Sequence, residues 1–256
     1  MILTRRAALN GIYLDELHDS IVIRSVDPGV TQESINAVNR MGGAGQRMTS
    51  QHWETLEAKV GFAIDIHRKQ LEERRQVFEL ACDWARGGGW LTVGNIPGRR
   101  LYADKVLLPG SGDLWDWTKE YTITFRAHNI PFWQEEEPVP ASADLTDGQF
   151  SVGVAGNVQT VMDVTLQNIS GANIKDITLA VNGRTMTVNN VNLGGSDTLR
   201  IHHGTDGILR AEIGETSVYE KLAGADDLYC EPGTATVYVK AQRALRVTAS
   251  AVGRYV

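Results

Sequence analysis

The sequence predicts a mainly β protein of two domains: an N-terminal antiparallel β domain with one packed α-helix, followed by a C-terminal β-sandwich. The length of 256 residues suits two domains of ordinary size. All six Trp residues precede Pro140, which indicates two different cores. Short alternating apolar segments fill both halves, whereas a single stretch has helical periodicity.

The N-terminal half opens with strand-like segments at residues 11–14 and 20–26, and an Asp-Pro-Gly turn at 27–29 follows the second. The polar, glycine-rich stretch from 31 to 50 has the composition of a mobile loop. No Lys-Ser or Lys-Thr pair follows its glycines, so a phosphate loop is not favoured. Residues 60–67 then alternate between apolar and smaller or polar types, as a half-buried strand does.

From Lys69 to Ala85 the period changes to that of an amphipathic helix. The expected apolar stripe consists of Leu71, Val77, Phe78, Ala81, Trp84 and Ala85. Charged residues cover the other side, including the i,i+4 neighbours Arg75 and Glu79, and they predict a solvated face or a subunit contact. The triplet Gly87-Gly88-Gly89 ends the helix, because glycine adopts left-handed conformations without steric cost.

Two further strands follow as a hairpin at residues 90–93 and 99–106, joined by the turn Asn-Ile-Pro-Gly at 95–98. Residues 115–127 predict another strand, in which Tyr121, Ile123 and Phe125 face one way. The first half therefore predicts an antiparallel sheet with one packed helix.

A connection rich in Glu and Pro at residues 134–144 separates the halves, so we expect domains of 1–138 and 139–256. The C-terminal half holds short alternating segments at 161–168, 177–181, 185–188, 199–201, 207–213, 236–239 and 245–250. Asn182-Gly183 predicts a two-residue hairpin turn, because both positions must tolerate positive φ. These segments predict an all-β sandwich.

The order of elements in the first half carries a resemblance to a known family. A helix at 71–81, a strand and turn at 91–99, a strand at 101–106 and a strand at 121–127 follow one another and close at Pro131-Phe132-Trp133. This order resembles the first domain of the distal tail proteins of long-tailed, siphovirus-type bacteriophages. The similarity extends over about half of the chain.

The resemblance implies a virion structural protein. Its N-terminal belt domain, residues 1–138, would form a homohexameric ring, and residues 139–256 would form a galectin-like β-sandwich. The ring would be a hub that connects the tail tube protein to the tail-tip, baseplate, tail-fibre or receptor-binding proteins. Its location would be the distal tip of the virion tail, after synthesis in the host bacterial cytoplasm.

A carbohydrate-binding β-sandwich that recognises the host surface is the alternative function. Its partner would be a host-surface glycan. Sugar sites usually stack an exposed Trp or Tyr on the sugar ring, and the second half has no Trp. The pattern of short strands is shared by both kinds of protein.

Composition argues against other partners. The net charge is −6 and neither half is basic, so we expect no sequence-specific nucleic-acid binding. No apolar run is long enough for membrane insertion. The cysteines, Cys82 and Cys230, lie far apart in sequence and are expected to be buried free thiols.

Enzyme signatures are missing, because the sequence has no Gly-x-Ser-x-Gly, His-Glu-x-x-His or Cys-x-x-Cys pattern. Four polar clusters could hold a metal ion or act as acids, namely His202-His203 with Asp206, His18 with its acidic neighbours, Asp226-Asp227 and Glu135–Glu137. Adjacent strand residues point to opposite faces, so His202 and His203 are not expected to share an ion. We therefore expect no enzyme activity, no catalytic residue, no metal and no cofactor.

Five residues are candidates for an oligomer or partner interface: Trp53, Arg99, Arg100, Trp115 and Trp117. Trp and Arg are the residue types that most often anchor interfaces. Arg99 and Arg100 lie at a predicted strand start, Trp115 and Trp117 lie in a predicted loop, and Trp53 lies beside the stretch from 31 to 50.

Overall fold

The computed structural model describes residues 5–39, 46–67, 69–111 and 119–256. The chain divides into two compact units, the first comprising residues 1–133 with the last residue and the second residues 134–255. The division lies between residues 133 and 134, whereas the sequence placed it between 138 and 139. Among the described residues, no helix has both the length and the apolar character needed to cross a membrane.

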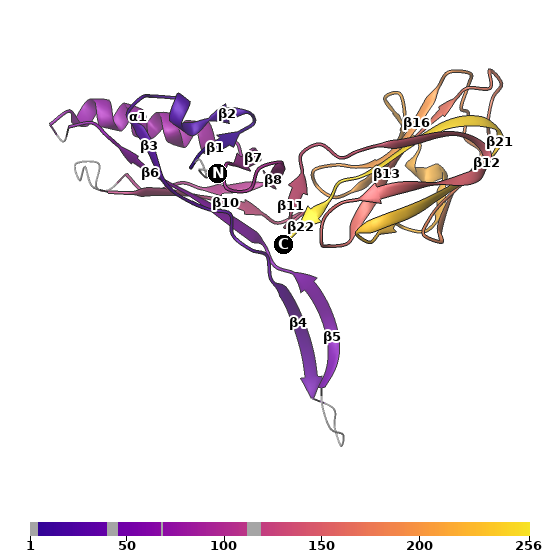
Figure 1. Cartoon of the computed structure of the whole chain (residues 1–256), viewed down its shortest axis with the longest axis horizontal. Helices are drawn as coiled ribbons and strands as arrows, with labels where there is room; N and C mark the ends of the chain where they lie inside the picture. Colours follow the sequence, from indigo (N-terminus) through magenta and orange to yellow (C-terminus); the bar gives the residue numbers. More distant parts are fainter. Residues whose placement is uncertain (1–4, 40–45, 68, 112–118) are drawn as a thin grey trace. The chain divides into compact units, whose positions relative to one another are not determined.

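The first unit combines β-sheets with a single long helix (Figure 1). Its elements are β1 (Ala7–Leu9), β2 (Ile12–Tyr13), η1 (Leu14–Glu16), β3 (Ile21–Asp27), β4 (Glu33–Asn39), β5 (Gln46–Trp53), β6 (Leu56–Ile64), α1 (Leu71–Ala85), β7 (Gly89–Val93), β8 (Arg99–Ala103), β9 (Lys105–Leu107) and β10 (Tyr121–Ala127). Strands β2, β1, β7 and β8 lie side by side in one antiparallel sheet, and β3, β6, β10 and β9 form another. Strand β4 pairs with β5.

Aromatic side chains join α1 to the sheet β3-β6-β10-β9. The ring of Tyr121 on β10 lies 5.6 Å from that of Phe62 on β6 and 5.0 Å from that of Phe78 on α1. Trp84 packs edge-on against Phe125 at 5.9 Å. The predicted alternation of β10 is confirmed, because Tyr121, Ile123 and Phe125 are buried while Thr122 is exposed. Burying one face of the sheet under α1 removes these apolar side chains from water and thereby stabilises the unit.

The inward face of α1 differs from the predicted stripe at its first turn. Leu71 is 50% exposed, so its assignment to the stripe was wrong. Arg74 is fully buried instead, and its Nη1 donates hydrogen bonds to the carbonyl oxygens of Ile64 (3.2 Å) and Ile66 (2.7 Å). The guanidinium thus satisfies backbone acceptors at the end of β6, which an apolar side chain could not do.

The predicted helix stop is confirmed. Gly88 has φ +62, and a Cβ at this position would lie 2.4 Å from the carbonyl oxygen of Ala103. Only glycine permits both this conformation and this approach of α1's end to β8. The chain then enters the predicted β7–β8 hairpin, in which Leu91 lies opposite Leu101.

The second unit is built from antiparallel strands (Figure 1). Its elements are β12 (Ala141–Val154), β13 (Thr160–Asn168), β14 (Ile177–Val181), β15 (Arg184–Val188), β16 (Thr198–His203), β17 (Leu209–Ile213), β18 (Thr216–Ser217), η2 (Tyr219–Lys221), β19 (Leu222–Gly224), β20 (Tyr229–Cys230), β21 (Gly233–Ala251) and β22 (Arg254–Tyr255), while β11 (Trp133–Glu135) spans the division. The main sheet has the order β18-β17-β16-β13-β21-β14-β15-β19, and β12 also pairs with β21.

Strand β21 belongs to both layers of this curled sheet. Its residues 245–251 pair with β13, and its residues 237–241 pair with β14. The sequence predicted two separate strands here, which was wrong, because one strand runs through both layers. Strand β12 runs beside it and accommodates the change of layer with a bulge between Leu145 and Asp147. The apolar core lies between the layers and includes Met162, Leu179 and Val239.

Strand β12 lies partly where the sequence predicted a linker. It begins at Ala141, so residues 141–144 of the expected connection are in fact paired with β21. The predicted turn between β14 and β15 is confirmed, since Asn182 has φ +49 and Gly183 has φ +85. Both positive values are those of a tight hairpin turn.

Asn168, at the end of β13, is the buried polar centre of one group of loops. Its Nδ2 donates to the carbonyl oxygens of Ala172 (2.6 Å), Leu193 (2.9 Å) and Gly194 (3.0 Å). Its Oδ1 accepts hydrogen bonds from the backbone N–H and the hydroxyl of Ser170. One buried side chain thus satisfies loop backbone groups that lack a strand partner.

His203 forms a buried ionic cluster at the end of β16. Its Nδ1 lies 2.9 Å from Asp163 Oδ1 and its Nε2 lies 2.8 Å from Asp227 Oδ1. Burial, the largest influence, opposes the charged ring, but the hydrogen bonds and charges of the two carboxylates together raise its pKa to about 9. The ring therefore carries a positive charge at neutral pH.

We expect Asn168→Ala to destabilise the second unit by about 3 kcal/mol, because it leaves several buried loop groups without partners. Urea unfolding of the purified protein, followed by far-ultraviolet circular dichroism, measures the change. Asn173→Ala, at an exposed position of the same loop region, is the matched control and should change the free energy of unfolding by less than about 0.5 kcal/mol. Equal losses in the two variants would contradict the assigned role of Asn168.

Because the folded-state pKa of His203 is raised, its contribution is fully present below the unfolded-state pKa of 6.5 and is lost as the pH rises through about 9. We expect the free energy of unfolding to fall by on the order of 2 kcal/mol between pH 7 and pH 9. Urea unfolding at both pH values measures this fall.

Two variants isolate this effect. His203→Gln should be less stable at pH 7 and should lose most of the pH dependence, whereas His202→Gln, which changes the neighbouring and more exposed imidazole, should keep it. Burial raises the pKa of Cys230 to about 11, so this thiol adds a loss of the same sign at higher pH that both variants retain. A wild-type protein whose stability is constant from pH 7 to pH 9 would refute the assignment.

Candidate assembly surface

Strands β4 and β5 form a hairpin, residues 33–53, which we call the arm. Its register runs from Glu33 opposite Trp53 to Asn39 opposite Gln46. The sequence predicted a mobile loop at 31–50, which was wrong: the polar residues that suggested a loop lie on a two-stranded ladder. The glycine-rich segment 42–45 lies outside the described residues. The alternation of Ile35 and Ala37 with polar residues was the signal that could have identified the strand.

Several contacts fix the base of the arm. The rings of Trp53 and Phe132 meet edge-on at 5.2 Å, and Trp133 Nε1 donates to the carbonyl oxygen of Pro28 at 3.0 Å. Thr31 is buried and its hydroxyl donates to the carbonyl oxygen of Glu54 at 2.7 Å. The arm therefore continues the β3–β6 ladder from an ordered base.

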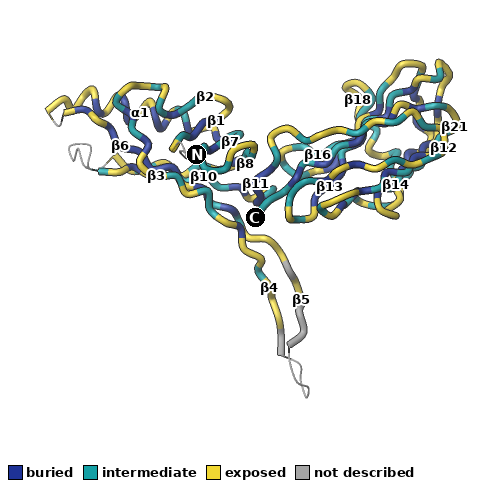
Figure 2. Tube along the Cα trace, viewed as in Figure 1, coloured by how far each residue is buried: buried dark blue, intermediate teal, exposed yellow. Residues whose placement is uncertain are grey.

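Beyond this base the arm is exposed. Its residues of described burial are exposed except Ser34, which is half-buried (Figure 2). Ile35 is 55% exposed, and among the described residues neither β4 nor β5 pairs with a third strand. A two-stranded hairpin alone is marginally stable in water, because it buries too little apolar surface to offset the entropy of ordering its residues. The arm is thus a segment that a partner would stabilise.

The sheet β3-β6-β10-β9 has two unlike free edges. Strand β3 lies at one edge and β9 at the other, with no further strand beside either among the described residues. Two consecutive leucines mark the β9 edge, Leu107 at 38% and Leu108 at 39% exposure. An exposed edge with apolar side chains is a site for pairing with another chain. Sequence analysis missed this edge, although the Leu-Leu pair directly after a strand was visible.

The face of this sheet opposite α1 carries charged groups of both signs. Arg126 on β10 forms an ion pair with Glu57 on β6 at 2.6 Å and lies opposite Lys105 on β9. Lys59 on β6 lies opposite Asp27 on β3. Residues directly opposite one another in antiparallel strands share a face, so this face carries Lys105, Arg126 and Lys59 together with the acidic Glu57 and Asp27.

The predicted interface residues lie in different settings. Trp53 is 37% exposed at the base of the arm. The guanidinium of Arg100 lies 4.0 Å from the ring centre of Trp90, so it already stacks within the β7–β8 hairpin, and Arg99 beside it is half-buried. Trp115 and Trp117 lie outside the described residues. The structure therefore brings Arg99 and Arg100 together on β8 and places Trp53 separately on the arm.

The clusters weighed for metal or acid chemistry have other partners. His203 is held by two carboxylates, while His202, on the opposite side of β16, lies 3.4 Å from Glu212. Within the described residues, no group of three or more His, Cys, Asp or Glu side chains is arranged to hold a metal ion. Both cysteines are buried and free, and burial raises the pKa of each thiol.

No protein-family model matches the sequence, and no curated protein matches it significantly. Among solved structures, the chain is similar to the SPP1 Dit (gp 19.1) protein, described as a paradigm of the hub adsorption apparatus in phages that infect Gram-positive bacteria. The two share 15% sequence identity with a TM-score of 0.69, over 99% of this chain and 100% of that one. A chain of the phage P2 baseplate in its activated conformation with Ca also aligns, over 98% of each chain, with 10% identity and a TM-score of 0.49.

The second similarity is too distant to support an argument, whereas the first covers both units. The sequence of the first half resembled the distal tail proteins, and the structural similarity to SPP1 Dit covers the second half as well. Over 99% of its length, the chain has the fold of the SPP1 distal tail protein Dit.

Proposed function

We propose that the protein is a structural component of a phage tail, a distal tail hub whose first unit forms a homohexameric ring. The observation that supports this most is the arm, a hairpin that pairs with no third strand among the described residues, in a chain with the Dit fold. An isolated hairpin of this kind becomes stable when another copy covers it. The role is one of assembly and involves no catalytic residue.

The first unit offers the two different surfaces that a ring requires. In a head-to-tail ring, each copy presents one surface to the copy ahead and another to the copy behind. We assign the arm and the β3 edge to one side, and the β9 edge with Leu107 and Leu108 to the other. Trp53, Arg99 and Arg100 remain proposed contributors to the contacts, and so do Trp115 and Trp117.

The polar face of the sheet β3-β6-β10-β9 suits the inside of such a ring. Two of its cationic groups face acids, Arg126 in the ion pair with Glu57 and Lys59 opposite Asp27, and this weakens its attraction for the phosphates of passing DNA. A solvated wall of mixed charge lets a nucleic acid or an extended protein pass. We therefore propose that this face lines the opening.

The partners of the hub would be the tail tube protein on one side and tail-tip, baseplate or receptor-binding proteins on the other. We propose that the second unit is a galectin-like sandwich that contacts the tip proteins. Its core is complete among its own strands, so it serves as a docking module rather than as part of the ring. The site of action would be the distal tip of the virion tail.

The arm can be removed while its base is kept. Replacing residues 34–52 with Asn-Gly retains Glu33 opposite Trp53 and the contact of Trp53 with Phe132. We expect the unaltered protein to form a ring of six 28.1-kDa copies, with a mass of about 169 kDa, and the variant to have the mass of one copy, because the stabilising contact is lost. Light scattering after size-exclusion chromatography measures both, and negative-stain images show whether the larger species has an open centre.

Circular dichroism and the melting temperature serve as controls, because the variant should keep the fold of both units. A variant that still elutes as a hexamer would show that the arm does not close the ring. An unaltered protein that is monomeric at all concentrations would contradict self-assembly.

Placing a charged residue on β9 tests whether this edge takes part in ring formation. Leu107→Lys should weaken ring formation at least tenfold, measured as the protein concentration at which half of the copies are assembled, because a lysine on an edge strand opposes pairing with another chain. Ile208→Lys is the matched control, since Ile208 is 60% exposed but lies in the second unit. Equal effects of the two substitutions would place the contact elsewhere.

A further inference from the structure

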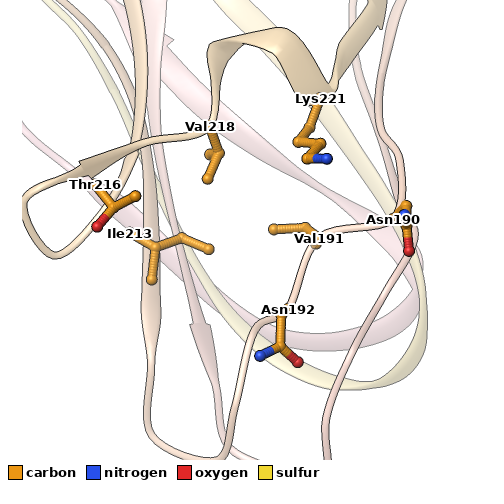
Figure 3. A pocket seen from close by; sticks show the side chains of 7 residues that line it. All are labelled: Asn190, Val191, Asn192, Ile213, Thr216, Val218 and Lys221. Atoms are coloured by element: carbon orange, nitrogen blue, oxygen red, sulfur yellow. The ribbon is translucent and has the colours of Figure 1, made fainter.

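We propose that a pocket in the second unit binds an acidic saccharide, a polyhydroxylated ring that carries one carboxylate. The pocket has a volume of about 430 Å³ and opens between the segment after β15, the β17–β18 turn and η2 (Figure 3). This size is within the range of small-molecule sites. It shares no residue with the arm or with the sheet edges described above.

Aliphatic side chains form the inner wall of the pocket. Val191, Ile213 and Val218 come from its three sides and converge in Figure 3. Val191 is 3% exposed and belongs to the core of the unit, whereas Ile213 and Val218 pack against that core from outside. A wall of this kind accepts the C–H face of a sugar ring and removes that face from water.

Polar groups surround this wall. Asn190, Asn192, Thr216 and Lys221 line the pocket, and the ends of their side chains make no hydrogen bond or ion pair with any described residue. Two amides and a hydroxyl both donate and accept hydrogen bonds, as sugar hydroxyls require. Lys221 is the charged residue among those that line the pocket, so the ligand it favours is an anion.

The backbone around the pocket is held in place before any ligand arrives. The N–H of Asn189 donates to the carbonyl oxygen of Lys221 at 2.9 Å, which ties two sides of the pocket together. The N–H of Asn190, whose φ is +52, donates to Asp176 Oδ1 at 2.9 Å. Val218 is fixed by a hydrogen bond from its N–H to the carbonyl oxygen of Ala211. A rigid rim lowers the entropy lost on binding.

The combination of groups selects the ligand class. A neutral apolar molecule would leave the amides and Lys221 unused, and a small inorganic anion would leave the aliphatic wall unused. A uronic acid satisfies both, with hydroxyls on the amides, its carboxylate on Lys221 and its C–H face on the wall. Binding of this ligand does not depend on the proposed ring, because the pocket lies within the second unit alone. In an assembly, each copy would present one such pocket.

Galacturonic acid is the probe, and galactose is the matched neutral probe with the same ring. Saturation-transfer difference NMR on the full-length protein detects weak binding at any oligomeric size. We expect a dissociation constant of about 1 mM for galacturonic acid, typical of a ligand this small. We expect binding about tenfold weaker for galactose, because galactose has no carboxylate to contact Lys221.

Three variants locate the site. Lys221→Met should weaken the binding of galacturonic acid about tenfold and leave the binding of galactose unchanged. Asn192→Trp should abolish the binding of both sugars, because the larger side chain fills the pocket. Lys240→Met removes an exposed lysine that pairs with Asp147 elsewhere in the unit and should have no effect. Melting temperatures and light scattering confirm that each variant keeps its fold and its assembly state.

The absence of saturation transfer at 10 mM galacturonic acid, about ten times the expected dissociation constant, would overturn the proposal. So would binding that survives both Lys221→Met and Asn192→Trp. Equal affinity for galactose and galacturonic acid would overturn the assignment of an acidic ligand. Failure to form a ring, with sugar binding intact, would leave this inference standing and would contradict only the proposed hub.

Discussion

The pairing of backbone groups along strand edges is the constraint on which both units depend. A strand that leaves its N–H and C=O groups unpaired must be covered, interrupted or joined by another strand. In the second unit, β21 has partners on both sides over most of its length, with β12 along one side and β13 or β14 along the other. In the first unit, the arm and the edges β3 and β9 have no such cover among the described residues. The two units therefore differ in what they need from a neighbour.

The same constraint explains why ordered polar side chains sit where strands end. Arg74 satisfies carbonyl oxygens just after β6, and Asn168 satisfies those of the loops beyond β13. Both residues are fully desolvated, so each hydrogen bond replaces one that water would otherwise make. His203 is different, since it joins β16 to two carboxylates by charge rather than by completing a backbone ladder. The contribution of His203 to the free energy of unfolding consequently depends on pH.

Periodicity was sufficient to predict the elements that have one buried face. The alternation of β10 and the stripe Val77-Phe78-Ala81 of α1 are visible in the sequence because a single period governs each. The arm was missed because none of its described residues is buried in one copy, so the alternation of Ile35 and Ala37 was a short signal within a polar stretch. Strand β12 was missed for a similar reason, since only Val152 and Val154 of its residues are buried. Arg74 could not be placed because its role depends on carbonyl oxygens whose positions the tertiary fold determines. The pocket combines residues from three segments that are separate in sequence, so no local motif could predict it.

The continuity of β21 also determines how the second unit can come apart. A sandwich made of two separate sheets can lose one layer while the other persists, and such partial opening exposes apolar surface. Here one strand of 19 residues contributes to both layers, so neither layer can detach while that strand stays intact. Local openings are then confined to the outer strands such as β18 and β19, and the rest opens in a single cooperative event. This arrangement gives the second unit resistance to proteases, because cleavage of a central strand must wait for global unfolding.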